Sequence, residues 1–256
     1  MFNRSPVGVA LAMTVLTVLS AGLTISPSVS ASNMPVVNST PLAKQVFKKP
    51  IVKHFAWQSY PVISLGSDEV FTRWIVVIYN PNKRAYGEYP TFRIVAKDAA
   101  GRLLASEEET LTGLIPGGKV AVSSQISTRV IPATVEAQIV DGDFVKTKAK
   151  PSSFRQFITS NIGIIPISGD EFDLSGEVTN PYPTAQNVAI TIAVKNIDGQ
   201  VIGGNTTYLD KIQPNQVTPF YAESTWTWAN GTPVTYEAFV APRTFLDPWT
   251  TNALKK

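Results

Sequence analysis

Two stretches of this chain, one hundred positions apart, end a run of apolar and β-branched residues with Asn-Pro. They read "VVIYNPNK" (Val76–Lys83) and "GEVTNPYP" (Gly176–Pro183). Proline has no N–H to donate to a sheet, and it favours an extended or turn conformation in the residue before it. Each Asn-Pro therefore predicts the end of a strand. The recurrence at domain length predicts that two related domains end a strand in the same way.

Similarity between the two halves continues on the C-terminal side of Asn-Pro, in the same order. The corresponding segments are "FRIVAKDAAGRLL" (92–104) with "ITIAVKNIDGQVI" (190–202), "LTGLIPGG" (111–118) with "LDKIQPNQ" (209–216), and "VEAQIV" (135–140) with "YEAFVA" (236–241). Matches that keep their order and a nearly constant offset are typical of duplicated domains. The sequence predicts two tandem copies, over residues 52–148 and 149–248.

The local patterns within each copy favour strands. In "NVAITIAVKN" (187–196) alternate residues are apolar, which is the period of a strand with one buried face. Gly101 and Gly199 supply the positive φ that hairpin turns need. The chain has 19 prolines and 16 glycines, which suits many short strands. The predicted fold class is all-β, as two tandem immunoglobulin-like antiparallel β-sandwiches.

The second copy resembles the FxLYD family of small immunoglobulin-like domains. The residues that carry the resemblance are Gly176-Glu-Val178-Thr-Asn180, Ile192-Ala-Val194-Lys-Asn196 leading into Asp198-Gly199, and then Leu209, Ile212, Pro214 and Phe220. The resemblance implies an extracytoplasmic domain without enzymatic activity. The motifs themselves occupy core and turn positions, so they support the fold and say little about activity.

The N-terminus has the pattern of a secretory signal peptide. Arg4 precedes twenty residues without a charge, Pro6–Ile25, and the small residues Val29 and Ala31 suit cleavage after Ala31. Residues 1–31 are therefore predicted to be removed. The alternative is an uncleaved membrane anchor, since twenty uncharged residues can span a bilayer. Both alternatives predict a secreted or cell-surface protein.

The net charge of +3 is distributed unevenly along the chain. The predicted basic leader, 32–51, and the two residues after it carry four lysines and no acidic residue. Residues 54–145 hold 8 basic and 10 acidic residues, and residues 151–249 hold 4 and 9. Acidic folded parts argue against nucleic-acid binding. The leader could contact a membrane or an anionic wall polymer weakly, or it could serve only as a solvated linker before the domains. At the other end of the chain, residues 249–256 are predicted to form a short tail.

Residue types exclude much of the common catalytic chemistry. The chain has no cysteine and only one histidine, His54, so thiol nucleophiles, disulfides and cysteine-based zinc sites are absent. The densest acidic clusters, Asp141-Gly-Asp143 and Asp170-Glu171-Phe-Asp173, read as ordinary turns in preference to calcium loops. We expect no metal, no cofactor and no enzymatic activity. The alternative from another class is a secreted hydrolase with an acidic residue pair.

Aromatic side chains provide the candidate binding residues. "STWTWANG" (Ser224–Gly231) has no aromatic counterpart in the first copy, and alternation along a strand would place Trp226 and Trp228 on one side. With Tyr221 and Trp249 they form the predicted contact surface, for an envelope protein or a polysaccharide. The sequence thus predicts a non-enzymatic binding or spacer protein of the cell envelope.

Two alternatives to this contact surface remain. In the first, Trp226 and Trp228 serve a carbohydrate-binding module. In the second, the pair packs against Phe245 and Trp249 to close the end of the sandwich. Trp57 and Trp74 are expected in the core.

Overall fold

The structure, a computed structural model, describes residues 47–62, 68–147, 153–168, 171–226, 232–243 and Trp249. All of them belong to one compact unit that spans residues 45–256. The predicted signal peptide, most of the basic leader, the predicted boundary at residues 148/149, Trp228 and the rest of the tail lie outside the described residues. Within the described ranges no helix is long and apolar enough to cross a membrane.

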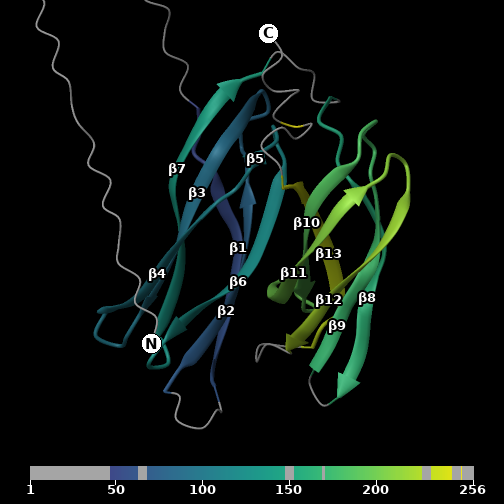
Figure 1. The fold of residues 1–256 in the computed structure, drawn as a ribbon. Helices are drawn as coiled ribbons and strands as arrows, with labels where there is room; N and C mark the ends of the chain where they lie inside the picture. The colour runs from purple at the N-terminus through teal and green to yellow at the C-terminus, as the bar shows by residue number, and fades with distance from the viewer. Residues whose placement is uncertain are drawn as a thin grey trace, which may run out of the picture. The chain divides into compact units, whose positions relative to one another are not determined.

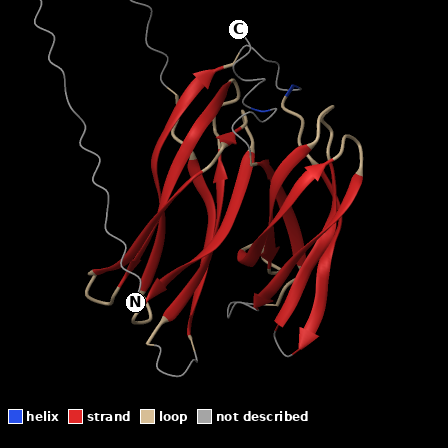
Figure 2. Ribbon diagram, viewed as in Figure 1, coloured by secondary structure: helices blue, strands red, loops and turns tan. Residues whose placement is uncertain are grey.

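Antiparallel β-strands dominate the described chain (Figures 1 and 2). In order they are β1 (Ile51–Pro61), β2 (Val70–Tyr79), β3 (Ala85–Lys97), β4 (Leu103–Thr110), β5 (Gly113–Leu114), β6 (Lys119–Thr128), β7 (Thr134–Lys146), β8 (Ile158–Ser168), β9 (Glu171–Thr179), β10 (Gln186–Lys195), β11 (Val201–Ile212), β12 (Val217–Trp226) and β13 (Thr235–Pro242). The predicted all-β fold class is confirmed.

The strands form four sheets, two in each half of the described chain. The first half has the sheet β1-β2-β6 and a second sheet in which β3 pairs with β4, β5 and β7. The second half has the sheets β8-β9-β12 and β11-β10-β13. Apart from the short strand β5, the pairing order is the same in both halves. The tandem repeat itself stays a prediction.

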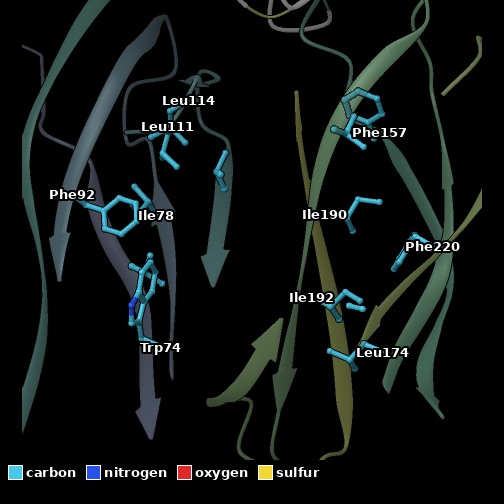
Figure 3. Close-up of a cluster of buried hydrophobic side chains, with 14 of the residues drawn as sticks. Trp74, Ile78, Phe92, Leu111, Leu114, Phe157, Leu174, Ile190, Ile192 and Phe220 are labelled. Atoms are coloured by element: carbon cyan, nitrogen blue, oxygen red, sulfur yellow. The ribbon is translucent and has the colours of Figure 1, made fainter. Parts of the chain in front are cut away.

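The interior of the first sandwich lies between β2 and β3. Trp74 and Ile78 from β2 face Phe92 from β3 (Figure 3). Ile94 of β3 belongs to the same cluster, and all four side chains are buried. The ring of Trp74 meets that of Phe92 edge-on, with centroids 5.8 Å apart. Burying an apolar side chain of this size contributes about 1.5–3 kcal/mol. Trp74 is therefore a core residue, as predicted.

The interior of the second sandwich lies between β9 and β10 (Figure 3). Leu174 from β9 faces Ile190 and Ile192 from β10, and Phe220 from β12 completes the cluster. Gly176 allows this packing, because a Cβ atom there would lie 2.5 Å from the Cζ atom of Phe220. The glycine of the "GEVTNP" stretch therefore has a steric role.

Both Asn-Pro pairs directly follow the end of a strand, because β2 ends at Tyr79 and β9 ends at Thr179. Asn80 is fully buried, and its side-chain amide donates to three backbone carbonyl oxygens, those of Ala85 (2.8 Å), Leu114 (3.1 Å) and Ile115 (3.1 Å). Its Oδ1 atom accepts from the backbone N–H of Asn82 at 2.9 Å. One side chain thus ties the strand end to the turn that follows it and to the segment after β5.

Asn180 makes the matching set of contacts in the second sandwich. It is also fully buried, and its amide donates to the carbonyl oxygens of Thr184 (2.8 Å) and Ile212 (2.9 Å). Its Oδ1 atom accepts from the backbone N–H of Tyr182 at 2.9 Å. The asparagine therefore has a structural role of its own in this motif, since it satisfies the buried carbonyl group of Ile212 and the buried N–H of Tyr182.

A second apolar cluster joins the two sandwiches. Ile75 and Val77 alternate with the core residues of β2 and so lie on the opposite face of the sheet β1-β2-β6. Together with Ala121 from β6, they pack against buried residues of the sheet β11-β10-β13, namely Ala193, Val201 and Phe239. Strand β2 is consequently buried on both faces.

Close contact between the sheet β1-β2-β6 and the sheet β11-β10-β13 depends on Gly204. A Cβ atom on Gly204 in β11 would lie 2.5 Å from Cδ1 of Ile75 and 2.4 Å from the carbonyl oxygen of Ile192. Nearby, the backbone N–H of Ser123 in β6 donates to the hydroxyl of Thr206 in β11 at 3.1 Å. The contact between the sandwiches therefore combines apolar packing with a directional bond.

Charged groups lie beside this contact, around His54 of β1. Glu237 pairs with both Lys195 and Lys119, the latter at 3.8 Å. Burial lowers the pKa of His54 below its usual 6.5. The positive charges of Lys195, Lys119 and Lys53, in decreasing order, lower this pKa further, and the negative charge of Glu237 opposes the shift. The folded protein therefore favours neutral His54.

We predict that Asn180→Ala lowers the free energy of unfolding by about 2–4 kcal/mol, because the buried carbonyl group of Ile212 loses its donor and the buried N–H of Tyr182 loses its acceptor. Urea denaturation of the protein measures the change. Asn187→Ala is the control, since the Asn187 side chain accepts one exposed bond, from the backbone N–H of Lys211, and should cost less than about 1 kcal/mol. Equal losses in the two variants would contradict the role given to Asn180.

We also predict that His54 makes stability depend on pH. The pKa of His54 is lower in the folded than in the unfolded chain, so protonation favours unfolding. The contribution of this group should be constant above pH 6.5 and should fall as the pH drops through 6.5 toward the folded pKa. Urea midpoints at about pH 8 and about pH 5.5 measure it, and His54→Gln should show a smaller decline. An unchanged decline in the variant would refute this assignment.

Candidate binding surface

The face of the sheet β8-β9-β12 that points away from the second core is built on β9. Leu174 and Val178 of β9 are buried in the core, so the alternating residues Ser175, Glu177 and Thr179 lie on the other face. Pairing with β8 and β12 arranges their neighbours in rows. We define the outer face by its ten residues, Ile158, Ser160, Ile165, Asp173, Ser175, Glu177, Thr179, Val217, Pro219 and Tyr221.

Apolar side chains lie along both edges of the outer face. Ile158 is opposite Thr179 from the β8 side and Val217 is opposite the same residue from the β12 side. Ile158 is 60% exposed, and Val217 and Ile165 are exposed as well. Large apolar residues gathered on one face of a soluble protein commonly mark a contact surface. The outer face therefore has the composition of an interaction site.

Two acidic side chains of β9 lie at the centre of the outer face, where Asp173 is buried and Glu177 is half-buried. The hydroxyl of Tyr221 donates to the carboxylate of Asp173. Glu177 accepts from the hydroxyl of Ser160 at 3.0 Å and from the side-chain amide of Asn161 at 2.7 Å. The ten residues of the outer face include no lysine or arginine. A partner with hydroxyl groups or positive charge would complement it.

The four predicted binding residues do not all come together. Tyr221 lies on the outer face and is 44% exposed. Trp226 is the last residue of β12, where its backbone pairs with Glu171, and its side chain, like Trp228, lies outside the description. Trp249 is 2% exposed and its Nε1–H donates to the carbonyl oxygen of Arg155 at 3.2 Å. Trp249 is therefore a packing residue in the structure.

Sequence reasoning missed the isoleucines of β8. The segment "ITSNIGIIPIS" (158–168) carries isoleucines on both faces of an edge strand. The register shift between Ser160 and Gly163 is what places Ile158 and Ile165 on the same face. A rule that assigns alternate residues to opposite faces fails at such a bulge. The five isoleucines and one proline within the eleven residues 158–168 were nevertheless a signal that this strand has apolar side chains on both of its faces.

The described residues contain no group of three or more His, Asp or Glu side chains arranged to hold a metal ion. Asp141, one of the clustered acidic residues, accepts from the backbone N–H of Gly142 at 2.8 Å. Asp141 and Asp143 lie inside strand β7, next to a register shift in its pairing with β3, and Asp173 is buried inside β9. The predicted turns are therefore wrong for these residues, because each of them is part of a sheet. The side chains of Asp143, Asp170 and Glu171 lie outside the description.

Comparison with known proteins adds little to this picture. No protein-family model matches the chain, and no curated protein matches it. Among solved structures it is similar to a beta-glucuronidase from glycoside hydrolase family 2, with 10% sequence identity and a TM-score of 0.25. The match covers 68% of this chain and 22% of that chain, so this chain spans less than a quarter of that protein. No conclusion about activity follows from it.

Proposed function

We propose that the chain is a non-enzymatic, extracytoplasmic binding or spacer protein of the cell envelope, and that the outer face of the sheet β8-β9-β12 is its contact surface. The observation that carries the proposal is the exposure of Ile158, Ile165, Val217 and Tyr221 on one sheet face. The signal-peptide pattern of residues 1–31 supports the location.

The opposite exposed sheet supplies the contrast. On β3, Arg93 pairs with Glu108 of β4, and Lys97 pairs with Glu136 of β7 at 3.1 Å. A sheet face whose charges are already paired with one another suits contact with water. The two outward sheets therefore differ in kind: the first carries charges that are paired with one another, and the outer face gathers the exposed side chains of Ile158, Ile165, Val217 and Tyr221.

We also propose that the two sandwiches are tandem immunoglobulin-like copies of the FxLYD type. Support comes from the shared pairing order, β1-β2-β6 with β8-β9-β12 and β4-β3-β7 with β11-β10-β13. The matched asparagines Asn80 and Asn180 support it as well. This second proposal concerns the relationship between the two sandwiches as scaffolds. The proposed contact surface is a separate matter, because it depends on residues in which the two copies differ.

A photo-reactive amino acid tests the contact surface directly. Placed at Tyr221 in cells that produce the full chain, it should form a covalent adduct with an envelope component on illumination, because this position lies on the outer face. The same amino acid at Arg93, on the charged face, is the matched control and should give none. Adducts at both positions or at neither would contradict the proposal. Urea midpoints verify that both variants fold.

A carbohydrate partner is the second candidate, favoured by the continuation of β12 from Tyr221 to Trp226. Aromatic rings along a strand can stack on sugar rings. We predict that wall polysaccharides then change the tryptophan fluorescence of the mature protein and that Trp226→Ala or Trp228→Ala weakens binding by roughly tenfold. If neither variant changes the affinity, the tryptophans do not form the site. Release of reducing ends or acyl groups would instead reveal a hydrolase.

A further inference from the structure

Strand β1 is the edge of its sheet among the described strands. It pairs with β2 alone. After a register shift between Val52 and His54, the pairing is regular from His54 opposite Val77 to Pro61 opposite Val70. In an edge strand, alternate backbone N–H and C=O groups point away from the partner strand. Bulges, charges or prolines protect most edge strands against pairing with another chain. In β1 the bulge and the charge of Lys53 lie at the start of the strand, and Pro61 lies at its end.

A groove of about 840 Å³ follows the regular part of β1. Seven consecutive residues, Lys53–Ser59, line one side. The opposite side comes from the turn between β10 and β11 and the start of β11, Asp198–Ile202, and from Ile131 and Pro132 between β6 and β7. Seven residues of strand extend over about 20 Å. The groove therefore runs along the strand, and both sandwiches contribute to it.

The side chains of the groove are mixed in character. His54, Ala56 and Gln58 lie on the face of β1 that is directed to the second sandwich, as their partners Val77 and Ile75 show. Ile131 is exposed at the rim, and Ile197, exposed to 85%, precedes Asp198. Lys53, Lys119 and Lys195 act on His54 at one end of the groove, and Glu237, which pairs with Lys119 and Lys195, offsets part of their positive charge.

We propose that this groove binds an extended peptide segment, which adds as a strand to the edge of β1. Main-chain bonds to β1 would supply affinity, and the exposed side chain of Ile131 would contact an apolar side chain of the peptide. The lysines around His54 favour an acidic residue at that end of the peptide. This site goes beyond the proposed function, because it uses neither the outer face nor Trp226 and Trp228.

A single extended peptide fits the groove better than a second folded copy of the chain. The edge of β1 lies between residues of two sandwiches, Ile131 and Pro132 on one and Asp198–Ile202 on the other. The corresponding edge of another copy lies in its own groove, so the walls of both would collide before the two edges met. A lone strand has no such walls.

The first experiment identifies peptides and locates them. Seven-residue peptides from a random display library are selected on the mature chain, and hydrogen exchange is measured with and without the best of them. We expect slower exchange of backbone amides within residues 53–59. Failure to select any peptide, or protection confined to the outer face, would overturn the proposal. So would protection of β1 that rises with protein concentration alone, since that would identify a second copy as the occupant.

The second experiment tests strand addition itself. Methylating the backbone nitrogens of the selected peptide at alternate positions produces two sets, and only the set that faces β1 should lose roughly tenfold or more in affinity. Equal effects of the two sets would show that the peptide does not bind as a strand.

Matched variants of the rim complete the test. Ile131→Arg should weaken binding by roughly tenfold, and Val130→Arg, at an equally exposed neighbour that lines a different hollow, should change it by less than about twofold. Lys53→Glu should weaken the binding of an acidic peptide. Lys49→Glu, at another exposed lysine, is the control. No difference within either pair would place the peptide elsewhere and overturn the proposal.

Discussion

Packing of one sheet face against another, with Ile75 and Val77 of β2 against Ala193 and Phe239, organises the rest of the described structure. It buries β2 on both faces and requires glycine at position 204. The same contact brings the β10–β11 turn opposite the edge of β1, which creates the groove. It also covers one sheet face of each sandwich. The outer face and the charged face of the first sandwich remain available to solvent.

Buried asparagine amides provide the second constraint. Asn80 and Asn180 each donate to backbone carbonyl groups from separate segments, and each accepts from the N–H two residues later. A carboxylate could not donate these bonds, and an apolar side chain would leave buried carbonyls without partners. The Asn-Pro pair thus combines a steric end to the strand with a polar connection across the end of the sandwich.

Alternation and turn residues were enough to predict the fold class, because a strand with one buried face has a simple period. The same rule failed where a strand has two buried faces or a bulge. "WIVVI" (74–78) carries apolar residues on both faces because a second sandwich covers β2. In β8 a register shift realigns the isoleucines. Of the predicted contact residues, Tyr221 is exposed on the outer face. The burial of Trp249 depends on distant residues and was not predicted.

Four properties follow from neighbours along the chain or from composition: the all-β class, the positions at which β2 and β9 end, the placement of Trp74 in a core and the lack of any cysteine-based site. Contacts between distant segments are needed to establish which sheet face is covered, which is open, and where β1 borders a groove. Those outcomes depend on contacts between residues such as Ile75 and Gly204, more than a hundred positions apart, whose proximity no local pattern encodes.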